Sequence, residues 1–162
     1  MSNNSGKIVL VTGGSRGLGK ESALQLAKSG FDVIITFQSS KESADNVVNE
    51  IKTLGRKSSR LQFDLEKTGS FDGFVSSLKE VLEKDFGKNK IDALVNNAGT
   101  GHYASIKETT EAAFDAMSSI HLKAPFFLTQ KLLPLIDNGG SIVNTSSGLA
   151  RFSYPIMPPM LL

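Results

Sequence analysis

The hydrophobic positions along the chain form two kinds of pattern, short unbroken runs and longer periodic stretches, and the two kinds alternate. Four apolar residues in succession at 8–11 predict a strand buried on both faces of a parallel sheet. Similar short runs predict further strands at 33–35, 60–63, 91–95 and 141–145. Apolar residues at helical spacing predict helices over 18–29, 41–54, 70–86 and 110–136. Pro125 and Pro134 are expected to bend or divide the last of these helices. This alternation predicts right-handed βαβ units and a doubly wound, parallel α/β sheet with strand order 3-2-1-4-5.

Composition narrows the class of protein. The chain has 162 residues, with 18 basic and 16 acidic side chains and a net charge of +2. This length is typical of one domain, and the charge is too small to favour nucleic acid or an anionic membrane surface. The absence of cysteine excludes disulfide scaffolds, iron–sulfur clusters, thiolate zinc sites and a cysteine nucleophile, and we expect no metal site. The first residues do not resemble a signal peptide and no apolar run is long enough to span a membrane, so we expect a cytoplasmic protein.

Residues 12–19, TGGSRGLG, stand between the first predicted strand and the first predicted helix. At such a place glycines permit a tight turn and let a pyrophosphate approach the backbone, while the helix N-terminus offers unpaired N–H groups. The spacing Gly13-x-x-x-Gly17-x-Gly19 differs from G-x-G-x-x-G and lacks the Gly-Lys-Ser/Thr of a P-loop. A glycine cluster after a strand can be a purely structural turn, but this position favours a dinucleotide-binding loop.

Three motifs together resemble the short-chain dehydrogenase/reductase family. TGGSRGLG is similar to the family's TGxxxGxG loop, and Asn96-Asn97-Ala98-Gly99, after the fourth predicted strand, is similar to its NNAG motif. Asp64-Leu65, after the third predicted strand, occupies the family's adenine-contacting position. The order and spacing of the motifs agree with the family over residues 6–155, and they resemble its 3-oxoacyl-acyl-carrier-protein reductase-like members.

The resemblance implies a Rossmann-like cofactor site drawn from three parts of the chain. The glycine loop would line the phosphates and ribose, Asp64 would accept from the adenine amine, and residues 97–99 would lie along the nicotinamide ribose. The NNAG segment is also interpretable as a tight turn, since Asn and Gly tolerate positive φ, and both interpretations can hold together. The cofactor-binding residues implied in this way are Gly13, Ser15, Arg16, Gly17, Leu18, Gly19, Asp64, Leu65, Asn97, Ala98 and Gly99.

The segment after the second predicted strand predicts which dinucleotide is bound. An NAD site places an Asp or Glu there to hold the ribose 2′-hydroxyl. Residues 36–41 read TFQSSK, and no carboxylate occurs before Glu42. A 2′-phosphate would meet Arg16, Gln38, Ser39 and Lys41 instead of a repelling acid. We therefore predict NADP(H) rather than NAD(H), with Gln38 among the cofactor-binding residues.

The resemblance also implies catalytic positions. In the family a Tyr is the general acid or base toward the substrate oxygen, a Lys lowers the Tyr pKa, and a Ser polarises that oxygen. Ser147, in the Ser-rich segment that leaves the fifth predicted strand, matches the family Ser, although such a segment can also be a plain strand end. His121 stands where the family has an Asn, and it could serve a proton relay or be a satisfied core histidine.

The Tyr and Lys themselves have no counterpart in the sequence. By the family's spacing, the Tyr position falls on Met160, and the Lys position on 164, past the last residue given. Tyr154 is too close to Ser147 to substitute. Residues 154–162 hold three of the chain's five prolines, and a one-base frame slip would explain this tail. A natural short form and a sequence artefact are alternatives.

These observations predict a single NADP-binding domain, truncated after the fifth strand, with 5–153 similar to the family and 154–162 aberrant. The implied function is NADP(H)-dependent hydride transfer between nicotinamide and a small-molecule carbonyl or alcohol substrate. We expect this chain to be inactive because it lacks the Tyr–Lys pair, and a non-catalytic NADP(H)-binding or interaction module is the alternative.

The resemblance further implies a homo-oligomer, a dimer or a tetramer, because in the family the helix matching 110–136 packs against a second subunit. We expect no membrane partner and no nucleic-acid partner. The basic segment 56–60, RKSSR, is the one feature that would suit nucleic acid, and we interpret it as a solvated loop before the third strand.

Overall fold

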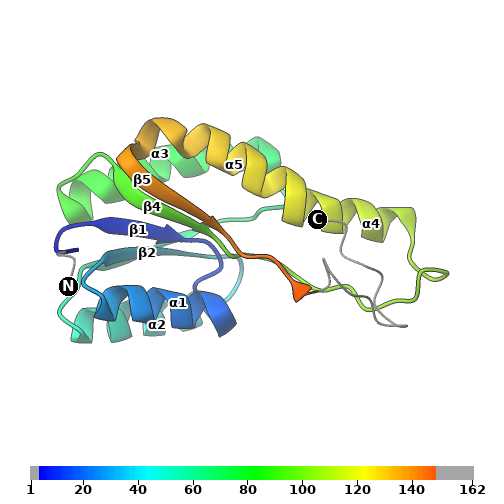
Figure 1. The fold of residues 1–162 in the computed structure, drawn as a ribbon, viewed down its shortest axis with the longest axis horizontal. Helices are drawn as coiled ribbons and strands as arrows, with labels where there is room; N and C mark the ends of the chain where they lie inside the picture. The colour runs from blue at the N-terminus through cyan, green and yellow to red at the C-terminus, as the bar shows by residue number, and fades with distance from the viewer. Residues whose placement is uncertain (1–3, 149–162) are drawn as a thin grey trace.

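The computed structural model describes residues 4–148, and the predicted doubly wound sheet is confirmed (Figure 1). All strand pairs are parallel, and the strands lie in the predicted order β3-β2-β1-β4-β5. The strands are β1 (Ile8–Val11), β2 (Asp32–Phe37), β3 (Ser58–Gln62), β4 (Ile91–Asn96) and β5 (Ile136–Asn144).

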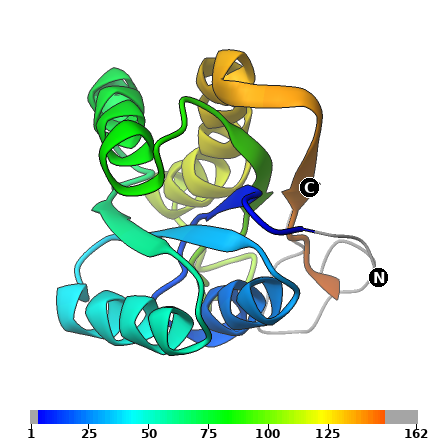
Figure 2. The same cartoon turned by 90° about the vertical axis from the view of Figure 1, so that its left-hand side faces the viewer.

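Helices cover both faces of the sheet (Figures 1 and 2). On one face lie α1 (Gly17–Lys28) and α2 (Lys41–Thr53), and on the other lie α3 (Phe71–Val81) and α5 (Ala124–Leu132). Helix α4 (Glu111–Ser118) leads toward α5 and extends beyond the sheet. The short helical segments are η1 (Thr68–Ser70), η2 (Leu82–Phe86), η3 (Ser119–Lys123) and η4 (Leu133–Leu135).

The sheet separates two hydrophobic cores. In β1, Ile8 and Leu10 belong to the core beneath α3 and α5, whereas Val9 and Val11 belong to the core beneath α1 and α2. All four side chains are buried. An unbroken apolar run is therefore what a central parallel strand with both faces covered requires.

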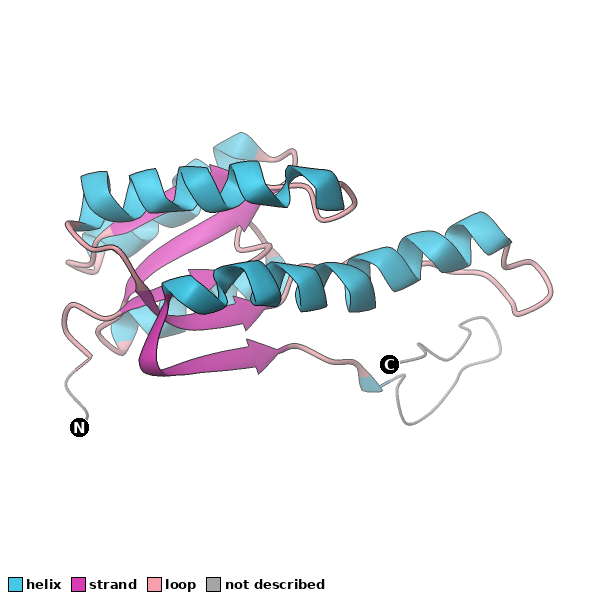
Figure 3. Ribbon diagram, turned by 90° about the horizontal axis from the view of Figure 1, so that it is seen from above, coloured by secondary structure: helices cyan, strands magenta, loops and turns pink. Residues whose placement is uncertain are grey.

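The helix predicted over 110–136 is divided into four segments. A π-helical turn, η3, separates α4 from α5, and Pro125, which has no N–H to donate, stands at the start of α5 directly after that turn. Pro134 lies in the 3₁₀ turn η4, after which the chain enters β5. Despite this division, helices α4 and α5 keep nearly the same axis (Figure 3).

Strand β5 begins earlier than the predicted 141–145. It pairs with β4 from Ile136, and its register shifts between the Ile91–Ile136 and Ala93–Ser141 pairs. The segment that follows Ile136, DNGG, is typical of a turn, but here it forms an irregularity in the ladder. Gly139 adopts a φ of +81°, and an added Cβ at Gly140 would lie 2.8 Å from the Asp92 carbonyl oxygen.

The basic segment 56–60 was only partly predicted. Ser58, Ser59 and Arg60 belong to β3, so the strand begins before the predicted 60–63 and the loop is shorter. The strand differs from the prediction because its pairing with Val33, Ile34 and Ile35 overrides the polar character of the two serines. Among residues 4–148, no helix is long and apolar enough to cross a membrane.

Candidate functional site

The loop between β1 and α1 is held by the neighbouring strand β2. The N–H of Gly13 donates to the Thr36 hydroxyl at 3.1 Å, and the N–H of Gly14 donates to the Thr36 carbonyl at 2.9 Å. Gly13 has a φ of +67°, in the left-handed region that favours glycine. The first turn of α1 contains no acidic residue, so no carboxylate of this turn opposes an anion at the helix N-terminus.

Two glycines are required because the loop packs against the NNAG turn. An added Cβ at Gly13 would lie 2.8 Å from the Cα of Ala98, and one at Gly19 would overlap the Gly13 carbonyl oxygen and the Asn97 side-chain amide. Gly17 differs, since nothing lies within 4 Å of an added Cβ although its φ is +56°. The open space beside Gly17 fits a group that approaches the backbone from outside.

The hydroxyl of Thr12 joins the two motifs, a role that the sequence reasoning missed. It accepts from the N–H groups of Asn97 and Ala98, both at 3.0 Å, and donates to the Val95 carbonyl at 3.3 Å. The Asn97 side-chain amide donates to the Thr12 carbonyl at 3.0 Å. Thr12 is 2% exposed, so these bonds form away from water. A threonine between a buried strand and the first glycine is the signal that could have identified it.

The two motifs border a hollow of about 590 Å³ at the carboxyl ends of the strands. It lies where the strand order reverses between β1 and β4, the usual crevice of an open α/β sheet. Every residue that the family resemblance implied for cofactor binding lines this hollow, and so do Gln38 and His121. The sequence reasoning did not assign a role to several other lining residues, which are Thr36, Phe37, Ser40, Phe63, Glu66, Thr100, Gly101, Ile120 and Thr145.

Asp64 has a dense set of hydrogen-bond partners at one end of the hollow. Its Oδ1 accepts from the Gln38 amide at 3.2 Å and from the Glu66 N–H at 3.1 Å, and its Oδ2 lies 3.2 Å from the Lys67 ammonium. Burial raises the pKa of the Asp64 carboxyl, but the Glu66 N–H, Lys67 and Gln38 together outweigh it, and the pKa lies below its ordinary value. The carboxylate is therefore charged at neutral pH, as an acceptor should be.

No carboxylate of the β2–α2 junction lines the hollow. Gln38, Ser39 and Ser40 line it there, together with Arg16 from the glycine loop. Glu42 stands in the first turn of α2 and does not line the hollow. Lys41, which we expected near a 2′-phosphate, does not line it either.

His121, in η3, packs against the loop that follows the NNAG turn. Its Nε2 lies 2.8 Å from the Thr100 carbonyl oxygen, and an added Cβ at Gly99 would lie 2.6 Å from its Cε1. In the tautomer that carries the proton on Nε2, this nitrogen donates to Thr100. The half-buried ring thus borders the hollow with one nitrogen held by the backbone.

Ser147 follows β5 and is exposed, and it does not line the hollow. Thr145, two residues earlier, does line it, and its N–H donates to the Asn96 carbonyl at 2.9 Å. The end of β5 is thus attached to β4, and Ser147 lies just beyond that attachment. Tyr154, Met160 and the rest of the segment 154–162 lie outside the described residues.

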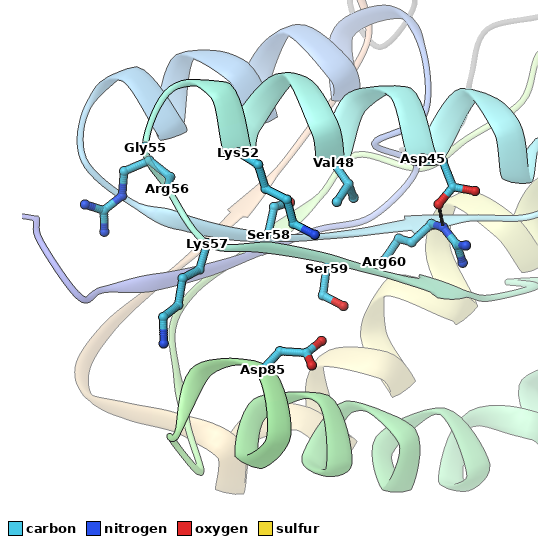
Figure 4. Close-up of a pocket in the computed structure, with 10 residues that line it drawn as sticks. All are labelled: Asp45, Val48, Lys52, Gly55, Arg56, Lys57, Ser58, Ser59, Arg60 and Asp85. Carbon is cyan, nitrogen blue, oxygen red and sulfur yellow. Dashed lines mark hydrogen bonds and ion pairs between the residues drawn. The ribbon is translucent and has the colours of Figure 1, made fainter.

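A second hollow, of about 710 Å³, lies along β3 between α2 and η2 (Figure 4). Its cations include both arginines of the basic segment 56–60. Arg60 forms an ion pair with Asp45 and lies over the Phe37 ring, and Arg56 pairs with Asp32 at 2.8 Å. Because both arginines are engaged by carboxylates of the protein, the segment offers less cationic charge than its sequence suggests.

Comparison with known proteins finds one family. The model of the short chain dehydrogenase family matches residues 7–159. A hydroxynaphthalene reductase-like protein from Metarhizium robertsii is 36% identical over 148 residues, which are 91% of this chain and 53% of that protein. A short-chain dehydrogenase/reductase from Pestalotiopsis microspora is 35% identical, over 93% of this chain and 55% of its own. The chain thus spans about half the length of these relatives.

Comparison with solved structures identifies the same family. The angucycline C-6 ketoreductase LanV with bound NADP is 35% identical with a TM-score of 0.91, and the match covers 96% of this chain and 61% of LanV. A short chain dehydrogenase from Burkholderia cenocepacia in complex with NADP is 36% identical with a TM-score of 0.85, over 96% of this chain and 61% of that one.

Proposed function

Because this chain belongs to the short-chain dehydrogenase family, we propose that it forms the NADP(H)-binding part of an oxidoreductase that interconverts a carbonyl compound and an alcohol. The observation that carries the proposal is the hollow at the carboxyl ends of the strands. The glycine loop, the Asp64 turn and the NNAG turn, far apart in sequence, all border it. Its size, its open backbone at Gly17 and its ionised Asp64 fit a dinucleotide.

The choice of NADP(H) over NAD(H) rests on charge. Arg16 borders the hollow near a β2–α2 junction that contributes only an amide and two hydroxyls to it. A 2′-phosphate would gain a cation and several donors there and would meet no carboxylate of that junction. Two of the structural relatives, LanV and the Burkholderia protein, were solved with NADP, which supports the same choice.

The chemistry would be shared between cofactor and chain. The bound nicotinamide supplies or accepts the hydride. Ser147 would polarise the substrate oxygen from the end of β5, and His121 would hold or pass a proton beside the Thr100 loop. The proton donor in the family is a Tyr, but Met160 stands at the corresponding position, and a thioether has no proton to give.

The 162-residue polypeptide, tested by itself, should therefore bind NADPH without turning over. This behaviour is also that of a non-catalytic NADP(H)-binding module, which the thioether at position 160 favours as the second candidate function. Calorimetry with NADPH and NADH measures the binding, and loss of NADPH absorbance with a panel of aryl and alkyl ketones measures turnover. Absence of cofactor binding, or NADH binding at least as tight as NADPH binding, would refute the assignment, and ketone reduction above background would refute inactivity.

We further propose self-association through the helices that lead to β5. Phe114, Leu122, Phe126 and Leu133 are large apolar side chains exposed by about half or more along α4, η3, α5 and η4. Such a row is typical of an interface between protein surfaces. Light scattering after size-exclusion chromatography should find a dimer or larger, and Phe126→Glu should shift it toward the monomer. A monomer at micromolar concentration in the unmutated chain would contradict the proposal.

A further inference from the structure

We propose that Gln38 is a positioning residue that links the adenine end of the dinucleotide site to its 2′-phosphate end by holding the Asp64 carboxylate. The inference rests on the function proposed above. It concerns how recognition of the adenine by Asp64, after β3, and recognition of the 2′-phosphate beside Gln38, after β2, depend on one another.

Adjacent strands bring the two side chains together. Phe37 at the end of β2 pairs with Gln62 at the end of β3, so Gln38 and Asp64 follow neighbouring strand ends. The Gln38 side-chain amide donates to Asp64 Oδ1 at 3.2 Å, and both residues line the hollow. The Gln38 backbone is itself held, because the Gln62 amide donates to its carbonyl at 2.9 Å.

The amide of Gln38 can act on both ends of the site at once. A side-chain NH₂ group has two donors, and the bond to Asp64 uses one of them. The second remains for an oxygen of a 2′-phosphate. Gln38 thus orients the adenine acceptor with one N–H, while the other is placed for the group that distinguishes NADP(H) from NAD(H).

The same contact explains what an acid would do at this position. A carboxylate at position 38 would face Asp64 where the amide now donates to it, and two like charges in such contact disfavour ionisation of both. Asp64 also accepts from the Glu66 N–H and pairs with Lys67. Removing the Gln38 amide would therefore cost the Asp64 carboxylate one hydrogen bond, and the bonds to Glu66 and Lys67 would remain.

The test is a double-mutant cycle on the 162-residue chain with two cofactors. Gln38→Met keeps the length of the side chain and removes its donors, and Asp64→Ala removes the carboxylate that accepts from Gln38. If Gln38 acts through Asp64, Gln38→Met weakens NADH binding by about threefold to tenfold, the effect of one net hydrogen bond. It weakens NADPH binding further, and in the Asp64→Ala background its effect on NADH disappears.

Gln25→Met is the matched control, because Gln25 is an exposed glutamine of α1 whose amide also donates to a carboxylate, that of Glu21, and it does not line the hollow. It should change either affinity by less than about twofold. Carbon NMR of Asp64 gives a readout that needs no cofactor, since Gln38→Met should raise the pKa of its carboxyl. Unfolding curves identify any variant that fails to fold.

Two results would overturn this inference and leave the proposed function standing. One is weaker NADPH binding with NADH binding unchanged in Gln38→Met, which would limit Gln38 to the phosphate. The other is an additive cycle together with an unshifted Asp64 titration. If the unmutated chain binds neither cofactor, the proposed function itself fails, and the inference fails with it.

Discussion

Strands β1 and β5 belong to one parallel ladder, yet they are packed very differently. All four residues of β1 are buried, whereas in β5 only Ile136 is partly buried and the rest are exposed. Helices cover β1 from both faces, and β4 and β2 flank it, while β5 stands at the edge of the described sheet. Strand β1, which leads into the glycine loop, is thus packed on both faces, whereas β5, which leads to Ser147, is largely exposed.

The loops at the ends of these strands differ in the same way. The loop after β1 is fixed by bonds to Thr36, Asn97 and Ala98, and Gly13 and Gly19 leave no room for a Cβ beside the NNAG turn. After β5, the N–H of Thr145 donates to the Asn96 carbonyl, and the residues that follow it up to 148 are exposed. A site needs a rigid support to keep its geometry, so this comparison favours the proposed cofactor site beside β1.

Gly19→Ala should have the largest effect, because it breaks the packed region at its tightest contact. The new Cβ would overlap the Gly13 carbonyl oxygen, and backbone cannot yield as a flexible side chain can. We expect a loss of about 3 kcal/mol in the free energy of unfolding, with no NADPH binding at micromolar concentration. Urea denaturation and cofactor fluorescence measure the two effects.

Gly73→Ala is the matched control for that substitution. Gly73 lies in α3, and nothing is within 4 Å of its added Cβ. Alanine is the better helix former, so this variant should be more stable by about 0.5–1 kcal/mol. Equal effects of the two substitutions would contradict the tight packing of the loop.

Thr12→Val tests the bonds between the glycine loop and the NNAG turn. Valine has nearly the same shape but cannot accept from the N–H groups of Asn97 and Ala98, which would lose a buried partner. We expect a cost of about 2–3 kcal/mol in unfolding free energy, together with weaker NADPH binding. Thr53→Val, at an exposed threonine of α2, should change stability by less than about 0.5 kcal/mol. A Thr12 variant as stable as the Thr53 variant would remove the proposed link.

Much of this site could be predicted because each motif is short and follows a strand directly. TGGSRGLG, Asp64-Leu65 and NNAG each occupy a strand's carboxyl end, and the parallel topology then brings them to one edge. What could not be predicted depends on distances between strands. The Thr12 hydroxyl reaches Asn97 because β1 pairs with β4, and the Thr36 hydroxyl reaches Gly13 because β1 pairs with β2.

The early start of β5 was missed, and the π turn of the long helix was not located, although Pro125 and Pro134 indicated a bend or a division. The DNGG segment has the local signature of a turn, and only pairing with β4 makes it part of a strand with a shifted register. The helix keeps its apolar stripe through the π turn at η3, so periodicity alone gives one continuous helix. In β5, pairing with β4 thus overrides a local preference for a turn.

Val11→Ala and Val143→Ala compare the two strands most directly. Both valines pair in register with Val95, one from each side of β4, so they occupy the same level of the sheet. Val11 is 0% exposed and Val143 is 51% exposed. We expect Val11→Ala to cost about 2 kcal/mol in unfolding free energy and Val143→Ala less than about 0.5 kcal/mol. Similar costs from urea denaturation would show that β5 is covered, and the comparison between the strands would fail.

Lys67→Ala should have the smallest effect on stability, and it tests how much a cation contributes to the lowered pKa of Asp64. The pKa of Asp64 lies below the ordinary value of an aspartate. The ionised carboxylate therefore stabilises the fold fully at a pH above that ordinary value, and this stabilisation is lost as the pH falls through the lowered pKa. Lys67 is 76% exposed, so its ion pair with Asp64 is worth less than about 0.5 kcal/mol. Carbon NMR should show the Asp64 pKa rising in Lys67→Ala while remaining acidic, because the Glu66 N–H and Gln38 still donate. Lys79→Ala, at an exposed lysine of α3, should leave the titration unchanged. If the Asp64 pKa does not move in Lys67→Ala, its lowering comes from the turn and Gln38 alone, and the cation has no part in setting the adenine acceptor.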